Sequence, residues 1–131
     1  MNRLEVIGAT PHLESLRCDE LLCEQYWHKG QLEEPANVIY LRCGDEWHRL
    51  CIDYGTIFWR TQKERPTPYL MPVWQGESRL DDLGVRIGIA NHVIVSFEQA
   101  AIEGGAEVVL QFDNGQVLTL RNINDHTTIV V

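Results

Sequence analysis

The residues of this sequence best suited to chemistry lie between positions 43 and 60. Cys43, His48, Cys51 and Asp53 are the types from which a thiol nucleophile, an imidazole base and an orienting carboxylate are assembled. Side chains alternate between the two faces of a strand, so Cys51 and Asp53 are expected to project away from His48. Cys43 would share the face of His48, but that face is otherwise leucine-rich. We therefore interpret His48 as a partly buried structural residue and assign no catalytic residue. The sequence does not settle whether the protein is an enzyme, and it favours a non-enzymatic one.

The four cysteines could instead bind a metal or form disulfides. A zinc site uses closely spaced ligand pairs of the C-x-x-C kind, whereas the spacings here are Cys18-x4-Cys23 and Cys43-x7-Cys51. Residues 1–6 include a glutamate where a secretion signal needs an apolar stretch, so we expect reduced thiols and a cytoplasmic location. Neither a metal nor another cofactor is predicted.

The chain is acidic, with 19 Asp and Glu residues against 11 Lys and Arg residues and a formal net charge of −8. This charge opposes binding to nucleic acid, whose affinity for proteins comes from Lys and Arg contacts to phosphate. Acidic residues gather between positions 10 and 36, whereas Arg60, Lys63 and Arg65 form the one basic cluster. The acidic stretch is either a solvated surface or a face that captures a basic partner.

Residues 61–82 are the most informative irregular stretch. Pro66, Pro68 and Pro72 forbid a regular helix and disfavour a central strand. The same stretch contains large apolar side chains, so disorder is not expected. Either it covers the core of the domain, or it offers anchor residues to a partner, since Tyr, Trp and Met are enriched at interfaces. The candidate anchors are Tyr69, Met71 and Trp74.

Two β-hairpins are predicted. In the middle of the chain, residues 38–43 and 46–52 are joined through Gly44-Asp45, and a two-residue turn pairs Ile39 with Leu50 and Leu41 with His48. Tyr40, Arg42, Arg49 and Trp47 then occupy the reverse face. Residues 107–112 and 117–120 flank Asn114-Gly115, the favoured type I′ turn pair. That turn would place Phe112 opposite Val117.

Further strands are predicted at residues 3–7, 56–60, 85–89, 92–97 and 127–131. Helix signals are confined to residues 11–28, where Thr10-Pro11 supplies an N-cap and a first-turn proline. The apolar residues there follow no single helical face, so a break near Asp19 into two helices is expected. The fold class is thus α+β. We expect a mainly antiparallel β meander or a partly closed β-barrel with one or two short N-terminal helices, in a single globular domain spanning residues 1–131.

Two functional hypotheses follow. The first is a non-enzymatic binding protein, such as a small acidic inhibitor or immunity-type protein acting on a basic protein partner. The second is a small-ligand-binding domain or minor enzyme that would bind a small apolar molecule in a barrel mouth lined by Tyr40, Trp47, Trp59, Tyr69 and Trp74. Homo-oligomerisation is compatible with both, and no run of apolar residues reaches membrane-spanning length. The candidate binding residues are Tyr40, Trp47, His48, Trp59, Arg60, Tyr69, Met71 and Trp74.

Overall fold

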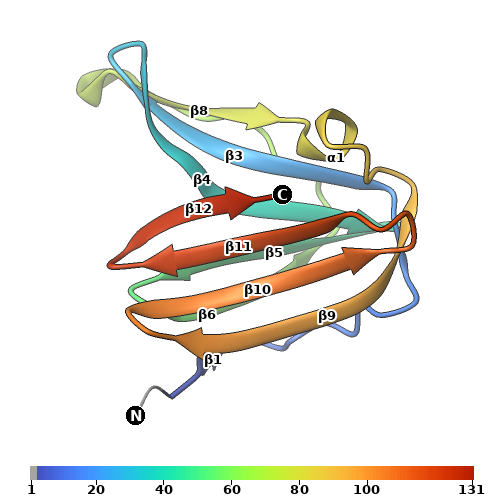
Figure 1. Ribbon diagram of the computed structural model, residues 1–131. Coiled ribbons are helices and arrows are strands. Elements are labelled where there is room, and N and C mark those ends of the chain that lie inside the picture. Colours follow the sequence, from blue (N-terminus) through green and yellow to red (C-terminus); the bar gives the residue numbers. More distant parts are fainter. Residues whose placement is uncertain (1–2) are drawn as a thin grey trace.

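Two β-sheets make up most of the protein in the computed structural model, which describes residues 3–131 (Figure 1). The larger sheet has seven strands in the order β1-β6-β5-β4-β3-β8-β7, and it is mixed because β1 runs parallel to β6. Its strands in chain order are β1 (Glu5–Ile7), β3 (Glu20–His28), β4 (Gln31–Cys43), β5 (Glu46–Asp53), β6 (Thr56–Gln62), β7 (Leu70–Met71) and β8 (Gly76–Asp81).

The smaller sheet has five antiparallel strands in the order β12-β11-β10-β9-β2, and it curls into a half-barrel. Its strands are β2 (Arg17–Cys18), β9 (His92–Ile102), β10 (Gly105–Phe112), β11 (Val117–Ile123) and β12 (His126–Val130). The helical elements in residues 3–131 are a 3₁₀ turn, η1 (Pro72–Trp74), and one short helix, α1 (Leu83–Arg86). No helix in this range has the length and apolar character needed to cross a bilayer.

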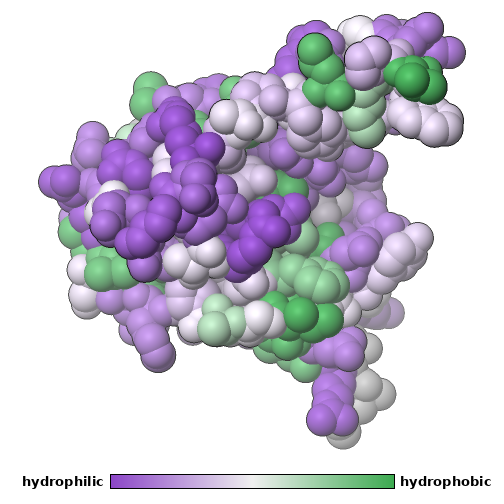
Figure 2. Space-filling model, turned by 180° about the vertical axis from the view of Figure 1, so that it is seen from behind, coloured by the Kyte–Doolittle hydropathy of each residue, from purple (hydrophilic) through white to green (hydrophobic). Residues whose placement is uncertain are grey.

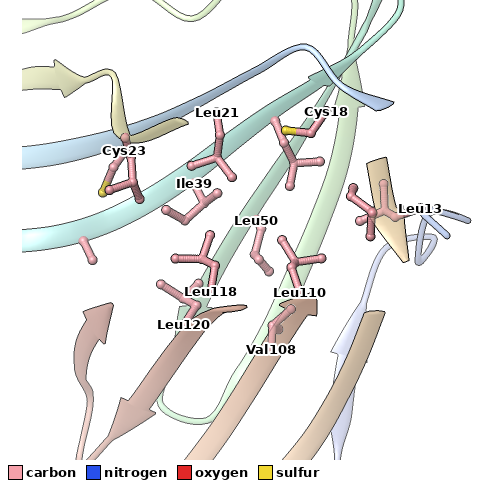
Figure 3. Close-up of a cluster of buried hydrophobic side chains, with 14 of the residues drawn as sticks. Leu13, Cys18, Leu21, Cys23, Ile39, Leu50, Val108, Leu110, Leu118 and Leu120 are labelled. Carbon is pink, nitrogen blue, oxygen red and sulfur yellow. The ribbon is translucent and has the colours of Figure 1, made fainter. Parts of the chain in front are cut away.

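The main core lies between the two sheets. Leucine and isoleucine side chains of the larger sheet point toward Val108, Leu110, Leu118 and Leu120 of the smaller one (Figure 3). Trp59 belongs to this core, where its ring packs edge-on against Phe97 with the ring centres 5.6 Å apart. The mainly β prediction is therefore confirmed.

Asn122 joins the two sheets inside this core. It lies on β11 and is completely buried, and its carbonyl oxygen accepts a hydrogen bond of 3.0 Å from the backbone N–H of Gly55. Its amide nitrogen donates to the Thr127 hydroxyl at 3.0 Å and to the carbonyl of Ile52 at 3.5 Å. Because Ile52 and Gly55 belong to β5 and the turn after it, one side chain fixes both sheets.

A second apolar cluster covers the outer face of the larger sheet, with Leu22, Val38, Tyr40 and Trp47 at its centre. The chain crosses this face between β6 and β7, and we call the crossing segment, residues 63–69, the strap. The Arg65 guanidinium lies 5.4 Å from the ring centre of Trp47 and bonds Glu20 on β3 at 2.7 and 2.9 Å. Pro66 is buried. The strap therefore seals an apolar face that would otherwise meet water.

The predicted N-terminal helices are wrong, because residues 17–28 form β2 and β3. The apolar residues of β3 belong to both faces: Leu21 and Cys23 enter the main core, and Leu22 joins the cluster on the outer face. A strand buried on both sides loses its alternation of apolar and polar residues, and a continuous apolar run does not distinguish strand from helix. The protein is mainly β, with one short helix that is not N-terminal, rather than α+β.

The register of the middle hairpin is confirmed. Ile39 pairs with Leu50, Leu41 with His48 and Arg42 with Trp47, and β6 extends the pair into the predicted meander. The strands predicted at residues 92–97 and 127–131 correspond to β9 and β12, whereas residues 85–89 instead contain the end of α1 and a turn.

The C-terminal hairpin forms in a register shifted by one residue. Gln111, rather than Phe112, pairs with Val117, so Leu118 and Leu120 enter the core. The N–H of Gly115 donates to the carbonyl of Phe112, and Gly115 has a φ of 88°. This is a three-residue loop that ends in a bulge at a glycine of positive φ, instead of a two-residue type I′ turn.

Candidate functional site

The most distinctive surface feature is an arm that projects from the body of the protein (Figure 1). We define the arm as residues 25–34 and 69–79. It consists of the outer part of the β3–β4 hairpin, the paired strand β8, and the short segment β7–η1 at the edge. The β8 strand was not predicted, because its sequence, residues 76–81, is polar and follows a proline-rich stretch.

The end of the arm exposes large apolar side chains. Val73 is 87% exposed, Leu70 72% and Trp74 70%. Seen from behind, the lobe at the top carries separate hydrophobic groups among polar ones (Figure 2). Burying a leucine or valine side chain is worth roughly 1.5–3 kcal/mol, so an isolated chain forgoes this stabilisation at the tip. Several large apolar side chains exposed within one short segment make the tip a candidate interaction site.

Hydrogen bonds hold the apolar tip in one conformation. The backbone N–H of Lys29, in the β3–β4 turn, donates to the carbonyl of Gln75 at 2.9 Å, and the N–H of Gln75 donates to Pro72 at 3.1 Å. Gln75 itself has a φ of 54°, which ends the 3₁₀ turn. A tip fixed before binding loses less conformational entropy when a partner covers it.

Side-chain packing along the arm supports the same rigidity. The Arg79 guanidinium lies 3.9 Å from the ring centre of Trp27, a cation–π contact between neighbouring strands. A Cβ atom on Gly76 would lie 2.4 Å from the hydroxyl oxygen of Tyr26, so a larger residue there would displace that ring. The Tyr69 N–H donates to the Ser78 hydroxyl at 2.8 Å. The arm is thus an ordered part of the fold, held by contacts between its own residues.

The arm carries more acidic than basic side chains. Its acidic residues are Glu33, Glu34 and Glu77, and its Lys and Arg residues are Lys29 and Arg79. Glu77 bonds Arg79 at 3.2 and 3.3 Å, which neutralises that pair. Glu33 lies 3.2 Å from the imidazole of His28. The apolar tip is therefore flanked by a mildly acidic surface.

The structure separates the aromatic residues that were predicted to line one barrel mouth. Tyr40 and Trp47 are buried on the outer face of the larger sheet, and Trp59 is buried between the sheets. Tyr69 stands at the end of the strap, where burial, followed by the nearby Glu24 carboxylate, raises the pKa of its hydroxyl. Trp74 occupies the tip of the arm. These residues therefore do not form a common wall.

The remaining predicted site residues also lie in different places. Met71 is partly buried at the arm edge, and Arg60 is exposed on β6, where it bonds Gln62. His48 is 7% exposed and lines a cleft at the end of the sheets that the arm does not reach. Of the candidates, only Tyr69, Met71 and Trp74 share the arm. Leu70 and Val73 were not predicted as site residues. Their position between Pro68 and Gln75, in the segment expected to offer anchor residues, could have indicated them.

The thiols lack the electrostatic environment of a nucleophile. Burial raises the pKa of Cys18 and Cys23 to about 12 and that of Cys43 to about 11. Burial also raises the pKa of Cys51, although Arg49 opposes the shift. Cys51 packs on the outer face while His48 faces inward, as the strand alternation predicted. The described thiols are therefore protonated near neutral pH, and a Cys–His nucleophile has no thiolate to use.

Comparison with known proteins yields no relative: no family model, no curated protein and no solved structure matches the chain. The protein is accordingly classed by its own architecture, as a mainly β, two-sheet protein with an apolar-tipped arm.

Proposed function

We propose that the protein is a non-enzymatic binding protein that inserts the tip of its arm into an apolar depression on a protein partner. The observation that carries the proposal is the joint exposure of Leu70, Val73 and Trp74 on a turn held by backbone hydrogen bonds. A tryptophan on a turn with a fixed backbone, next to aliphatic side chains, is the kind of anchor that dominates binding energies.

The charge of the chain supports a basic partner. The net charge is −8, and glutamates flank the arm. Complementary charge around an apolar contact accelerates encounter and selects partners, while the apolar anchor supplies most of the affinity. An inhibitor of a basic protein fits this division of roles. The free cysteines support a reducing, cytoplasmic setting for the interaction.

The proposal is tested with two matched double variants. Val73→Ser with Trp74→Ser removes the anchor, whereas Tyr54→Ser with Val85→Ser removes two apolar side chains that are similarly exposed elsewhere. Partners captured by cross-linking are identified, purified and titrated against each variant. Loss of a hot-spot anchor costs about 2 kcal/mol or more, so we expect affinity to fall at least roughly 30-fold for the arm variant only.

Two results would contradict the proposal. If the wild type and the arm variant bind the partner with equal affinity, the tip of the arm is not the anchor. If the affinity stays constant when the salt concentration is raised, the partner is not recognised through basic charges, because exposed charge pairs are screened by salt.

A further inference from the structure

A cleft at the end of the two sheets, lined by no residue of the arm, has the features of a small-molecule site. Its volume is about 680 Å³, and its walls come from the N-terminal segment 9–17, the β4–β5 turn and the ends of β5 and β6. Small-molecule sites commonly occupy 300–1,000 Å³ and combine apolar walls with a few polar groups. Pro11 and Leu16 provide apolar wall here.

His48 supplies a polar group at the cleft that the fold leaves partly unused. The residue is 7% exposed, and within residues 3–131 its imidazole has one hydrogen-bond partner, the Thr61 hydroxyl, 3.4 Å from Nδ1. Every fully buried side-chain nitrogen and oxygen atom in that range has a partner. Nε2 therefore is not fully buried, and His48 is one of the residues that line the cleft.

Carboxylates dominate the charged lining. Among residues 3–131, Asp19, Asp45 and Glu46 line the cleft against a single guanidinium, that of Arg17. The backbone N–H of Gly44 donates to Asp19 at 2.8 Å and, together with Arg17, lowers the pKa of that carboxyl, which therefore stays ionised.

A lysine ammonium group lies at the rim of the cleft, next to two carboxylates. The ammonium nitrogen of Lys63 lies 3.3 Å from Asp45 and 3.7 Å from Glu46, and the lysine side chain is well exposed. An exposed lysine held by exposed carboxylates contributes little to stability and is readily displaced. A ligand ammonium can take the place of this side chain.

We propose that this cleft binds a small organic amine. The ammonium group lies between Asp45 and Glu46, a polar group of the ligand meets Nε2 of His48, and the apolar body packs on Pro11 and Leu16. Lys63 occupies the ammonium position in the free protein. This site is independent of the partner proposed for the arm, because none of its residues belongs to the arm.

Three aromatic probes of similar size and different charge test the proposal: benzylamine, benzyl alcohol and phenylacetate. Each is titrated at millimolar concentration and low salt into isotopically labelled protein, and amide and imidazole chemical shifts are followed. We expect benzylamine to bind most tightly and phenylacetate most weakly, with shifts centred on residues 43–48. Equal or tighter binding of the neutral or anionic probe would overturn the proposal. Shifts elsewhere, or none, would do so as well.

Surface variants sharpen the test without disturbing the core. Lys63→Met should strengthen benzylamine binding and Glu46→Gln should weaken it, each by about two- to fivefold, as expected for one partly exposed charge contact. Lys29→Met, which removes the same charge from the arm, should leave binding unchanged. Equal effects of the two lysine variants would show that only net charge matters and would refute a defined site. His48→Phe should weaken benzylamine binding, provided that its circular dichroism matches the wild type.

Discussion

Asn122 offers the sharpest test of how the two sheets are held together. Asn122→Ala removes two hydrogen bonds of 3.0 Å, to Gly55 and Thr127, and a weaker one to Ile52, from a fully buried position. A net hydrogen bond is worth about 1 kcal/mol, and a buried group left without its partner costs about 1–3 kcal/mol. We expect the free energy of unfolding to fall by about 2–4 kcal/mol. For a domain of this size the melting temperature should drop by roughly 10 °C.

Asn114→Ala is the matched control for this variant. Asn114 also makes two side-chain hydrogen bonds, at 2.8 Å to Gly88 and 3.0 Å from Gln116, but it is exposed. Water can replace those bonds, so the loss should stay below about 1 kcal/mol. Urea unfolding measures both free energies, and hydrogen exchange at Gly55 reports the lost inter-sheet bond. Equal destabilisation by the two variants would refute the argument that burial makes Asn122 a structural link.

Three further predictions concern the outer face and the arm. Arg65→Ala removes the cation–π contact and the ion pair that hold the strap. The variant should lose about 1–2 kcal/mol of unfolding free energy in urea and be cleaved faster by proteases within the strap. Unchanged proteolysis would contradict the role of Arg65 in holding the strap. Glu24 is 6% exposed, and burial raises its pKa above 4.5, so the ionised form destabilises the fold at neutral pH. Glu24→Gln should therefore be more stable than the wild type near pH 7. The difference in the free energy of unfolding should shrink as the pH falls through the folded pKa of Glu24 and vanish below the unfolded pKa. A difference that grows on acidification would contradict the raised pKa of Glu24. Val73→Ser with Trp74→Ser should change unfolding by less than about 0.5 kcal/mol, because exposed side chains contribute little, and a larger loss by thermal melting would show that the tip supports the fold.

The sequence predicted strand pairing where it predicted the turn type correctly. In the middle hairpin both faces carry buried apolar residues, and the two-residue turn at Gly44-Asp45 fixes the register that pairs Ile39 with Leu50. In the C-terminal hairpin both possible registers had apolar candidates, and the loop type decided between them. The β3 strand was mistaken for helix because both of its faces carry buried apolar residues, so the alternation of apolar and polar residues that marks a strand is missing.

The candidate site was predicted in part. The prolines around Tyr69 and Trp74 indicated a non-helical segment with anchor residues, and the structure places that segment on the arm. The exposure of Leu70 and Val73 depends on where β8 pairs, which is a tertiary property. Trp59 and Tyr40 were grouped with Trp74 by residue type alone, and the alternation of side chains along β4–β6 sends them to different layers.

The short outermost strands of the larger sheet determine how the protein can meet other chains. β1 contributes three residues and β7 two, so each offers few free backbone groups to an incoming strand. Sheets with such abbreviated margins resist growth by addition of further chains and the fibrous assembly that follows from it. A partner that binds at these edges must therefore contact side chains rather than backbone groups. The largest side chain next to β7 is that of Trp74.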